Sequence, residues 1–216
     1  MTLRVLTRYH LELLVRSQRW LAPGLAYVVV LGLGLSGGDD VLSAAAFSAG
    51  LLVPVTVWLT RGAVTAEPPQ SRACLVVAAG WRRVQLSALF AAASAGLALG
   101  GLGLLAVLLV GSGGSPAALL AGVVATVVCA LSGAAVGALC NRPVVVGAQY
   151  AVPLGLGGVV AVLLVPGSPA NAVVRALVLG SRRHAAGVPW WTLPVAALLA
   201  AAGWWAAALA AEHRGE

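Results

Sequence analysis

The sequence predicts an all-α integral membrane protein with six transmembrane helices and an interfacial amphipathic helix at its N-terminus. Of the 216 residues, 61% are hydrophobic and 9% are charged, and the mean hydropathy of +0.99 lies outside the usual range of soluble domains. The apolar residues form runs near the length of about 20 residues that crosses a bilayer. The chain therefore reads as one transmembrane domain, 1–216, with expected spans at 20–35, 41–59, 84–110, 116–139, 144–165 and 190–211.

The segment before the first span, residues 2–20, has the pattern of an amphipathic helix. Four arginines and Glu12 recur at steps of three or four residues, which places them on one arc of a helix. Most of the apolar side chains occupy the other side. Such a helix lies in the membrane interface, with arginine near anionic head groups and leucine at the acyl boundary. The alternative is a basic tail that only sets topology, and we favour the interfacial helix because a tail needs no apolar face.

The arginines predict the orientation of the chain, because cytoplasmic loops carry the excess of positive charge. With the N-terminus inside, ten of the thirteen arginines face the cytoplasm, and only Arg175, Arg182 and Arg183 fall outside. Both termini are then cytoplasmic. The chain contains neither lysine nor isoleucine, which suggests a GC-rich bacterial genome and hence the bacterial cytoplasmic (inner) membrane.

Small residues and the last outer loop predict how the helices pack. The spacings Gly96-x-x-x-Gly100 and Gly133-x-x-x-Gly137 let helices approach closely, and we expect this packing within the chain rather than at a dedicated dimer face. The outer loop 167–189 is too long for a turn. We expect a short helix there, Ala170–Leu179, that dips into the outer leaflet or packs over the bundle.

The spans lack the chemistry of an enzyme. They hold no ionisable residue near their centres, where such residues are expensive and mark function. Ser132 has no histidine within a span to act as its base, and the three cysteines lack metal-ligand spacing. We expect no catalysis, no cofactor and no metal on this chain, and no nucleic-acid partner. A secondary transporter or channel is harder to exclude, although it would usually carry a buried charge or a selectivity ring.

The cytoplasmic loop 61–83 contains the most unusual stretch, TAEPPQSRACLVVAAGWRR. Its apolar run, Cys74–Ala79, is too short to cross a bilayer and is bracketed by Glu67, a double proline and arginines. An exposed apolar run in water is a liability unless a partner covers it. The alternative is that Leu75–Ala79 begins the third membrane helix early and packs on the bundle.

This order of elements resembles the permease subunit of type-2 ABC exporters. By architecture the resemblance covers essentially the whole chain, and by sequence it depends mainly on residues 61–89. It implies a coupling helix between the second and third spans that inserts into a groove on a separate ATPase. The residues that match this element are an acidic residue, an apolar turn and a basic pair, namely Glu67, Cys74, Leu75, Val76, Val77, Arg82 and Arg83. Glu67 is followed by Pro-Pro, where the family often has Gly-Thr.

The resemblance also implies the partners. They are an ABC-type ATPase that binds ATP and Mg²⁺, and a second six-span permease half, so that the working unit is a homodimer or heterodimer with two ATPase copies. The chain cannot be a conventional ATPase itself, since it has no lysine for a phosphate-binding loop. Export is the direction implied. A second class of function stays open, a non-transporting six-helix scaffold or immunity-type protein.

The spans also suggest a class of cargo. A pathway through them would be lined by small apolar residues and a few neutral polar groups, for which the candidates are Thr126, Ser132, Gln149 and Tyr150. No buried charge is available to pair with an ion. We therefore expect a hydrophobic or amphiphilic cargo, such as a lipid, an antibiotic or a drug-like compound, entering from the inner leaflet. The alternative is a cargo whose polar head stays near Arg82 and Arg83 while its tail enters.

Overall fold

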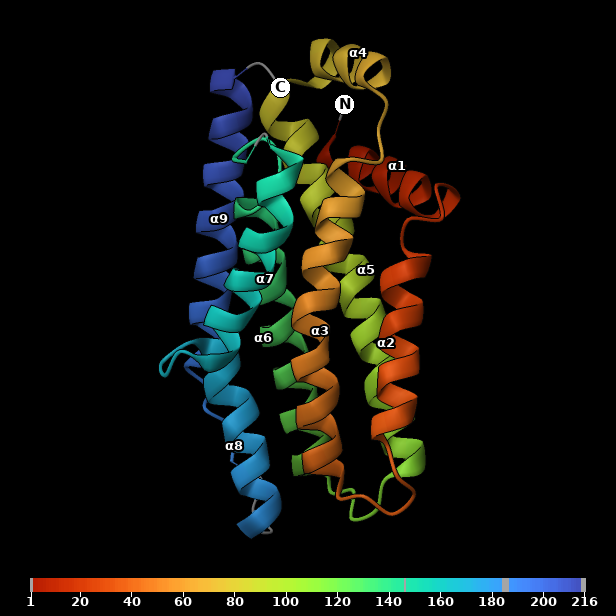
Figure 1. The fold of residues 1–216 in the computed structure, drawn as a ribbon, viewed down its shortest axis with the longest axis vertical. Coiled ribbons are helices and arrows are strands. Elements are labelled where there is room, and N and C mark those ends of the chain that lie inside the picture. The colour runs from red at the N-terminus through yellow and green to blue at the C-terminus, as the bar shows by residue number, and fades with distance from the viewer. Residues whose placement is uncertain (1, 146, 184–186, 215–216) are drawn as a thin grey trace.

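The computed structural model describes residues 2–145, 147–183 and 187–214, and these ranges contain helices and no strands (Figure 1). Nine helices follow one another in these ranges. They are α1 (Leu3–Arg16), α2 (Leu21–Gly34), α3 (Val41–Val64), α4 (Pro69–Ala79), α5 (Trp81–Val110), α6 (Pro116–Leu139), α7 (Ala148–Leu164), α8 (Pro169–Arg183) and α9 (Thr192–Arg214). The all-α class predicted from the sequence is confirmed.

Four of these helices, α3, α5, α6 and α9, are long and apolar enough to cross a membrane. The helices α7 and α8 form a pair bent by 47° that counts as a fifth crossing if the pair is one broken span. The break contains Gly167, whose φ of +95° suits glycine. The apolar helix α2 has 14 residues and extends about 21 Å, less than the hydrocarbon core of about 30 Å.

The long helices begin where side chains satisfy their free amide groups. Asp40 precedes α3 and its carboxylate accepts a hydrogen bond from the Ser43 amide. Ser115 precedes α6 and accepts from the Ala118 amide at 3.1 Å, with Pro116 as the first helical residue. Both are preferred residues for the start of a helix, and proline in the first turn loses no hydrogen bond.

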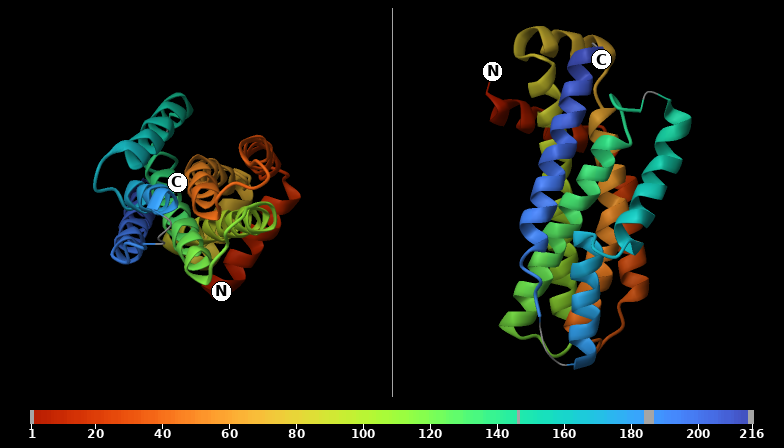
Figure 2. Two further views of the ribbon diagram at one scale, coloured as in Figure 1. Left: turned by 90° about the horizontal axis from the view of Figure 1, so that it is seen from below. Right: turned by 90° about the vertical axis from the view of Figure 1, so that its left-hand side faces the viewer.

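Helix α3 lies at the centre of the bundle and packs against α6, α5, α8 and α2. The end-on and side views of Figure 2 show α7 leaning away from the bundle at the end where it begins. Helix α8 continues from α7 toward the opposite end and packs on α3 and α6 through Pro169, Ala170, Val173, Leu177 and Gly180.

Glycine brings the neighbours of α3 close to it. A side chain on Gly96 of α5 would meet Thr56, and a side chain on Gly133 of α6 would meet Thr56 and the carbonyl of Val53. One turn further on, Gly100 faces Leu52 and Thr126, and Gly137 faces Thr60. Both glycine pairs are thus used inside the chain, which confirms the intramolecular packing expected from their spacing.

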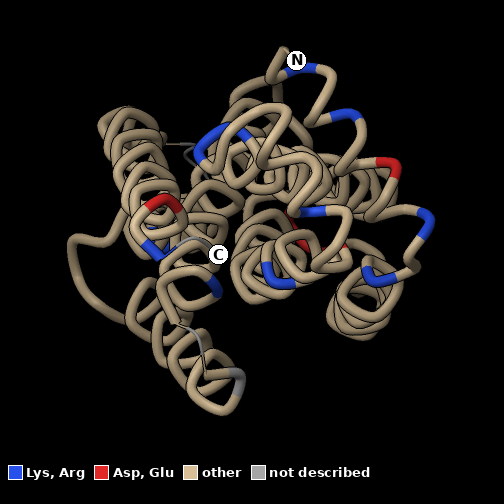
Figure 3. Tube along the Cα trace, turned by 90° about the horizontal axis from the view of Figure 1, so that it is seen from above, with Lys and Arg blue, Asp and Glu red and all other residues tan. Residues whose placement is uncertain are grey.

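Helices α1 and α4 lie across one end of the bundle, where α9 also ends (Figure 1). Helix α1 packs on α5 and α3 with Leu6, His10 and Leu14. Its exposed side carries Val5 and Val15 beside the arginines. Seen from above this end, the trace carries several basic positions and few acidic ones (Figure 3). The placement of α1 in a membrane interface stays a prediction.

Candidate functional site

Helix α4 stands apart from the bundle. It begins after Pro68, has Pro69 in its first turn and ends at Gly80, whose φ of +83° and ψ of +152° interrupt the path into α5. This backbone region is essentially reserved for glycine. Helix α4 contacts only α5 among the described elements, and none of its 11 residues is buried. The segment is therefore a separate helix and not an early start of the third span.

The apolar side chains of α4 are exposed to different degrees. Val77 is 90% exposed, and the thiol of Cys74 is free and exposed. Leu75 and Val76 are half-buried. A surface helix normally turns its apolar side chains inward, so the outward position of Val77 singles out this face of α4.

Glu67 lies in the short segment that leads from α3 into α4, and its side chain contacts α1. Tyr9 donates a hydrogen bond from its hydroxyl to Glu67 Oε1 at 3.3 Å, and His10 Nε2 lies 3.7 Å from Glu67 Oε2. The side chains of His10 and Glu67 are each 3% exposed. Desolvation, the negative charge of Glu67 and this hydrogen bond all raise the pKa of Tyr9 above its ordinary value.

His10 extends the same cluster to α5. Its Nδ1 lies 2.9 Å from the carbonyl oxygen of Leu6, to which it can donate in the tautomer that has the proton on Nδ1. The Ser87 hydroxyl donates to the carbonyl of Val84 at 2.8 Å and lies 3.2 Å from the same Nδ1. The Nε2 atom of His10 is thereby directed to Glu67, and the cluster joins α1, α5 and the residue that precedes α4.

The arginines of the loop fall into three settings. Arg72 of α4 donates to Gln85 Oε1 of α5 at 3.1 Å. Arg82 pairs with Glu212 and lies over the Trp205 ring at 5.4 Å, which joins α5 to α9. Arg83 is exposed. A partly exposed pair such as Arg82 with Glu212 contributes about 1 kcal/mol or less, so it positions the helix start more than it stabilises the fold.

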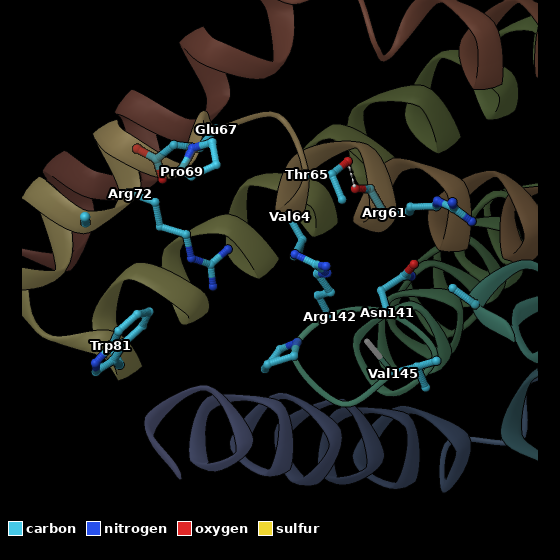
Figure 4. A pocket seen from close by; sticks show the side chains of 13 residues that line it. Arg61, Val64, Thr65, Glu67, Pro69, Arg72, Trp81, Asn141, Arg142 and Val145 are labelled. Atoms are coloured by element: carbon cyan, nitrogen blue, oxygen red, sulfur yellow. Dashed lines mark hydrogen bonds between the residues drawn. The ribbon is translucent and has the colours of Figure 1, made fainter. Parts of the chain in front are cut away.

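A cavity of about 610 Å³ lies beneath α4, between the end of α3, the start of α5 and the connection from α6 to α7 (Figure 4). Three arginines line it, Arg61, Arg72 and Arg142. Figure 4 shows Arg72 and Arg142 pointing toward each other, Arg61 pointing away from that pair, and the Glu67 carboxylate turned away from the cavity. The cavity is therefore rich in guanidinium groups.

The four candidate pathway residues lie in different surroundings. Thr126 and Ser132 are buried in the packed interior of α6, where Thr126 donates to the carbonyl of Gly122 at 2.8 Å. Gln149 and Tyr150 are exposed near the start of α7. None of the four lines the 610 Å³ cavity. Whether they line a transport pathway stays a prediction.

Sequence reasoning missed His10, Arg61, Asn141 and Arg142 as members of this region. They come from three segments far apart in the chain, and no local spacing relates them. One signal was present, since Arg61 and Arg142 both follow directly on apolar spans at the predicted cytoplasmic side. No protein-family model, curated protein or solved structure matches the chain, so the residues of the site and the fold carry the functional inference.

Proposed function

We propose that the chain is the membrane-spanning subunit of an ABC exporter that moves a hydrophobic or amphiphilic compound across the bacterial cytoplasmic membrane. A separate ATPase subunit binds and hydrolyses ATP with Mg²⁺, and α4 is the coupling helix that docks on it. A second permease half, a copy of this chain or a sister chain, completes the transporter.

One observation carries the proposal, the exposure of α4. A helix of 11 residues without a single buried side chain has little reason to keep Val77 and Cys74 apolar unless a partner covers them. Its position is nevertheless defined, because Gly80 turns it away from α5, Arg72 bonds to Gln85, and Glu67 is held by α1. An exposed helix that these few contacts hold at one end of the bundle suits a groove-binding role.

The proposed topology has six crossings, α2, α3, α5, α6, the broken pair α7–α8, and α9, with α1 in the inner interface. An even number of crossings returns the chain to the side on which it began, and α1 and the end of α9 do lie at one end of the bundle. A bilayer accommodates a short helix such as α2 by local thinning, at a fraction of a kcal/mol per Å. In this topology ten of the thirteen arginines fall on the side of α1, which favours the cytoplasm for that side.

The test separates docking from folding. Val77→Asp adds a charge at a position that is 90% exposed. We therefore expect an unfolding free energy within about 0.5 kcal/mol of that of the wild type. Co-expressed with the ABC-type ATPases of its host, the wild-type chain should retain one of them through purification and display ATP hydrolysis. The Val77→Asp variant should lose both, because the charge is left unpaired in an apolar groove.

Two matched controls accompany this test. Val15→Asp makes the same change on α1, at the same end and 59% exposed, and should leave docking intact. Replacing the phosphate-binding lysine of the captured ATPase should abolish hydrolysis but not docking. If Val77→Asp retains the ATPase as well as the wild type does, α4 is not the docking helix. A chain that retains no ATPase at all would favour the scaffold alternative.

A further inference from the structure

We propose that the arginine-lined cavity beneath α4 binds the phosphate head group of an anionic lipid, and that the lipid chain lies in the groove between α3 and α7. The site concerns Arg61, Arg72 and Arg142, together with the apolar groove that adjoins them. It requires neither ATP nor a partner. That such a lipid is also the exported cargo would rest on the function proposed above.

The charge of the cavity is the first reason. The described residues that line it include three arginines and one carboxylate, Glu67, which is hydrogen-bonded to Tyr9 and faces α1. Arginine does not lose its proton in proteins, so these described side chains keep an excess of positive charge at any physiological pH. Within the described part of the chain, the guanidinium groups of Arg61 and Arg142 make no hydrogen bond or ion pair, and Arg61 accepts from Thr65 only through its backbone carbonyl.

The geometry of these arginines is the second reason. Arg72 and Arg142 come from different segments and point toward each other (Figure 4). Both guanidinium groups are positively charged, so an anion that lies between α4 and the connection after α6 is attracted by each of them. The planar guanidinium forms paired hydrogen bonds with phosphate oxygens, which makes phosphate a better match than a simple halide.

The adjoining groove decides between a lipid and a free anion. A second cavity, of about 550 Å³, lies between α3 and α7 and shares Arg61, Asn141 and Ala151 with the first. The rest of its lining is apolar and consists of Pro54, Val57, Trp58, Val152, Gly155, Leu156 and Val159. From Arg61 to Pro54 it follows α3 for about 10 Å.

The two adjoining cavities match the two parts of an amphiphilic molecule, a charged head and an apolar tail. A charged cavity at the end of the bundle opens beside an apolar groove on the leaning helix α7, and Arg61 borders both. A free phosphate would use only the first cavity, and a neutral oil only the second. A lipid with a phosphate head uses both at once. The volume of the first cavity suits a head group, since ligand sites in proteins commonly measure about 300–1,000 Å³.

The experiment uses the full chain alone, freed of lipid in detergent, without an ATPase. Short-chain phosphatidylglycerol and phosphatidylcholine with equal acyl chains are titrated by calorimetry, and glycerol 3-phosphate serves as the head without a tail. We expect the anionic lipid to bind about tenfold or more tightly than the zwitterionic lipid. Glycerol 3-phosphate should bind more weakly than the anionic lipid, because it leaves the groove empty.

Variants localise the binding. The double variant Arg61→Gln with Arg142→Gln should weaken phosphatidylglycerol binding about tenfold or more. Arg16→Gln removes a charge from the same end but lies outside the cavity, and should leave binding unchanged. Val152→Phe narrows the groove, so it should weaken the binding of both lipids and leave the binding of glycerol 3-phosphate unchanged. Val160→Phe, on the same helix but outside the groove, is its control.

Several outcomes would overturn the proposal. Equal affinity for the two lipids would mean that the arginines do not distinguish the two head groups. A loss of phosphatidylglycerol affinity in Arg16→Gln as large as in the double variant would mean that the lipid is attracted to the basic surface in general. Glycerol 3-phosphate binding as tight as the lipid would assign the cavity to a free anion. Val77→Asp should bind lipid like the wild type, so failure of ATPase docking and failure of lipid binding are separable.

Discussion

Helices α4 and α6 are both rich in alanine and valine, but only α6 hides these side chains. Most of α6 is buried against α3 and α9, and its interface with α3 depends on Gly133 and Gly137. Helix α4 has no buried residue. The difference lies in what surrounds the apolar run. Small residues at four-residue spacing let α6 approach a neighbour, whereas α4 is bounded by a double proline and by Gly80 and ends before it can join the bundle.

The largest loss of stability is expected from a change at the contact between α6 and α3. In Gly133→Ala the new methyl group would clash with Thr56 and lie 2.6 Å from the carbonyl oxygen of Val53. The backbone contact cannot move aside as a flexible side chain can, so we expect a loss of about 3 kcal/mol in unfolding free energy. Circular dichroism during denaturation in detergent measures this loss.

The matched control is Gly101→Ala in α5, because nothing lies within 4 Å of the added carbon there. That variant should be neutral or gain about 0.5–1 kcal/mol, since alanine favours a helix more than glycine does. Equal losses in the two variants would show that the α3–α6 contact is not the close one described.

A smaller effect is expected at the boundary of α4. Gly80→Ala places a side chain at φ +83° and ψ +152°, which costs about 1–3 kcal/mol if the backbone keeps this conformation. Helix α4 has nothing buried to hold it, so we expect it to reorient and release the strain. The global unfolding free energy should therefore fall less than in Gly133→Ala.

Spin labels on Cys74 and on an introduced Val15→Cys report the position of α4 relative to α1, in a background with Cys140→Ala. Gly80→Ala should shift or broaden the distance distribution between the two labels, and Gly101→Ala should not. An unchanged distribution together with an unchanged stability would mean that Gly80 does not set the direction of α4.

The apolar runs were enough to predict α3, α5, α6 and α9, because length and hydropathy are local properties of the chain. The separate helix α4 was also within reach, since its breaking residues, Pro68, Pro69 and Gly80, stand in the sequence. The spans at 20–35 and 144–165 stay predictions, because the helices found there, α2 and α7, are short and the second continues into α8 after a bend.

The surroundings of Glu67 were out of reach for a different reason. The sequence marked it as an acidic residue of a coupling loop, but its contacts with Tyr9 and His10 join residues 58 and 57 positions away. The arginine-lined cavity likewise combines α3, α4 and the connection after α6. Such sites depend on how helices cross at one end of the bundle, and no periodicity in a single segment encodes that crossing.

The smallest effect on stability is expected at the contact between α1 and Glu67, the residue in the segment that leads into α4. Desolvation raises the pKa of Tyr9, and the charge and hydrogen bond of Glu67 raise it further. Ionised Tyr9 would place a negative oxygen beside the carboxylate. The stabilisation from this contact is therefore complete below the pKa of an ordinary tyrosine, about 10, and is lost as the pH rises through the higher pKa of Tyr9 in the folded chain.

Glu67→Gln removes the charge but keeps an oxygen that accepts from Tyr9, so the pKa of Tyr9 should fall toward that of an ordinary tyrosine. Desolvation remains, so the pKa should stay above the ordinary value. Alkaline titration of tyrosinate absorbance, with the curve of Tyr9→Phe subtracted in each background, isolates this hydroxyl from Tyr27 and Tyr150.

Glu12→Gln is the control. Glu12 lies on α1 like Tyr9, is exposed and pairs with Arg8 at 3.0 Å. A Tyr9 curve that moves equally in both variants would assign the effect to the overall charge of α1, and only a shift specific to Glu67→Gln supports a direct contact that holds α1 against the approach to α4.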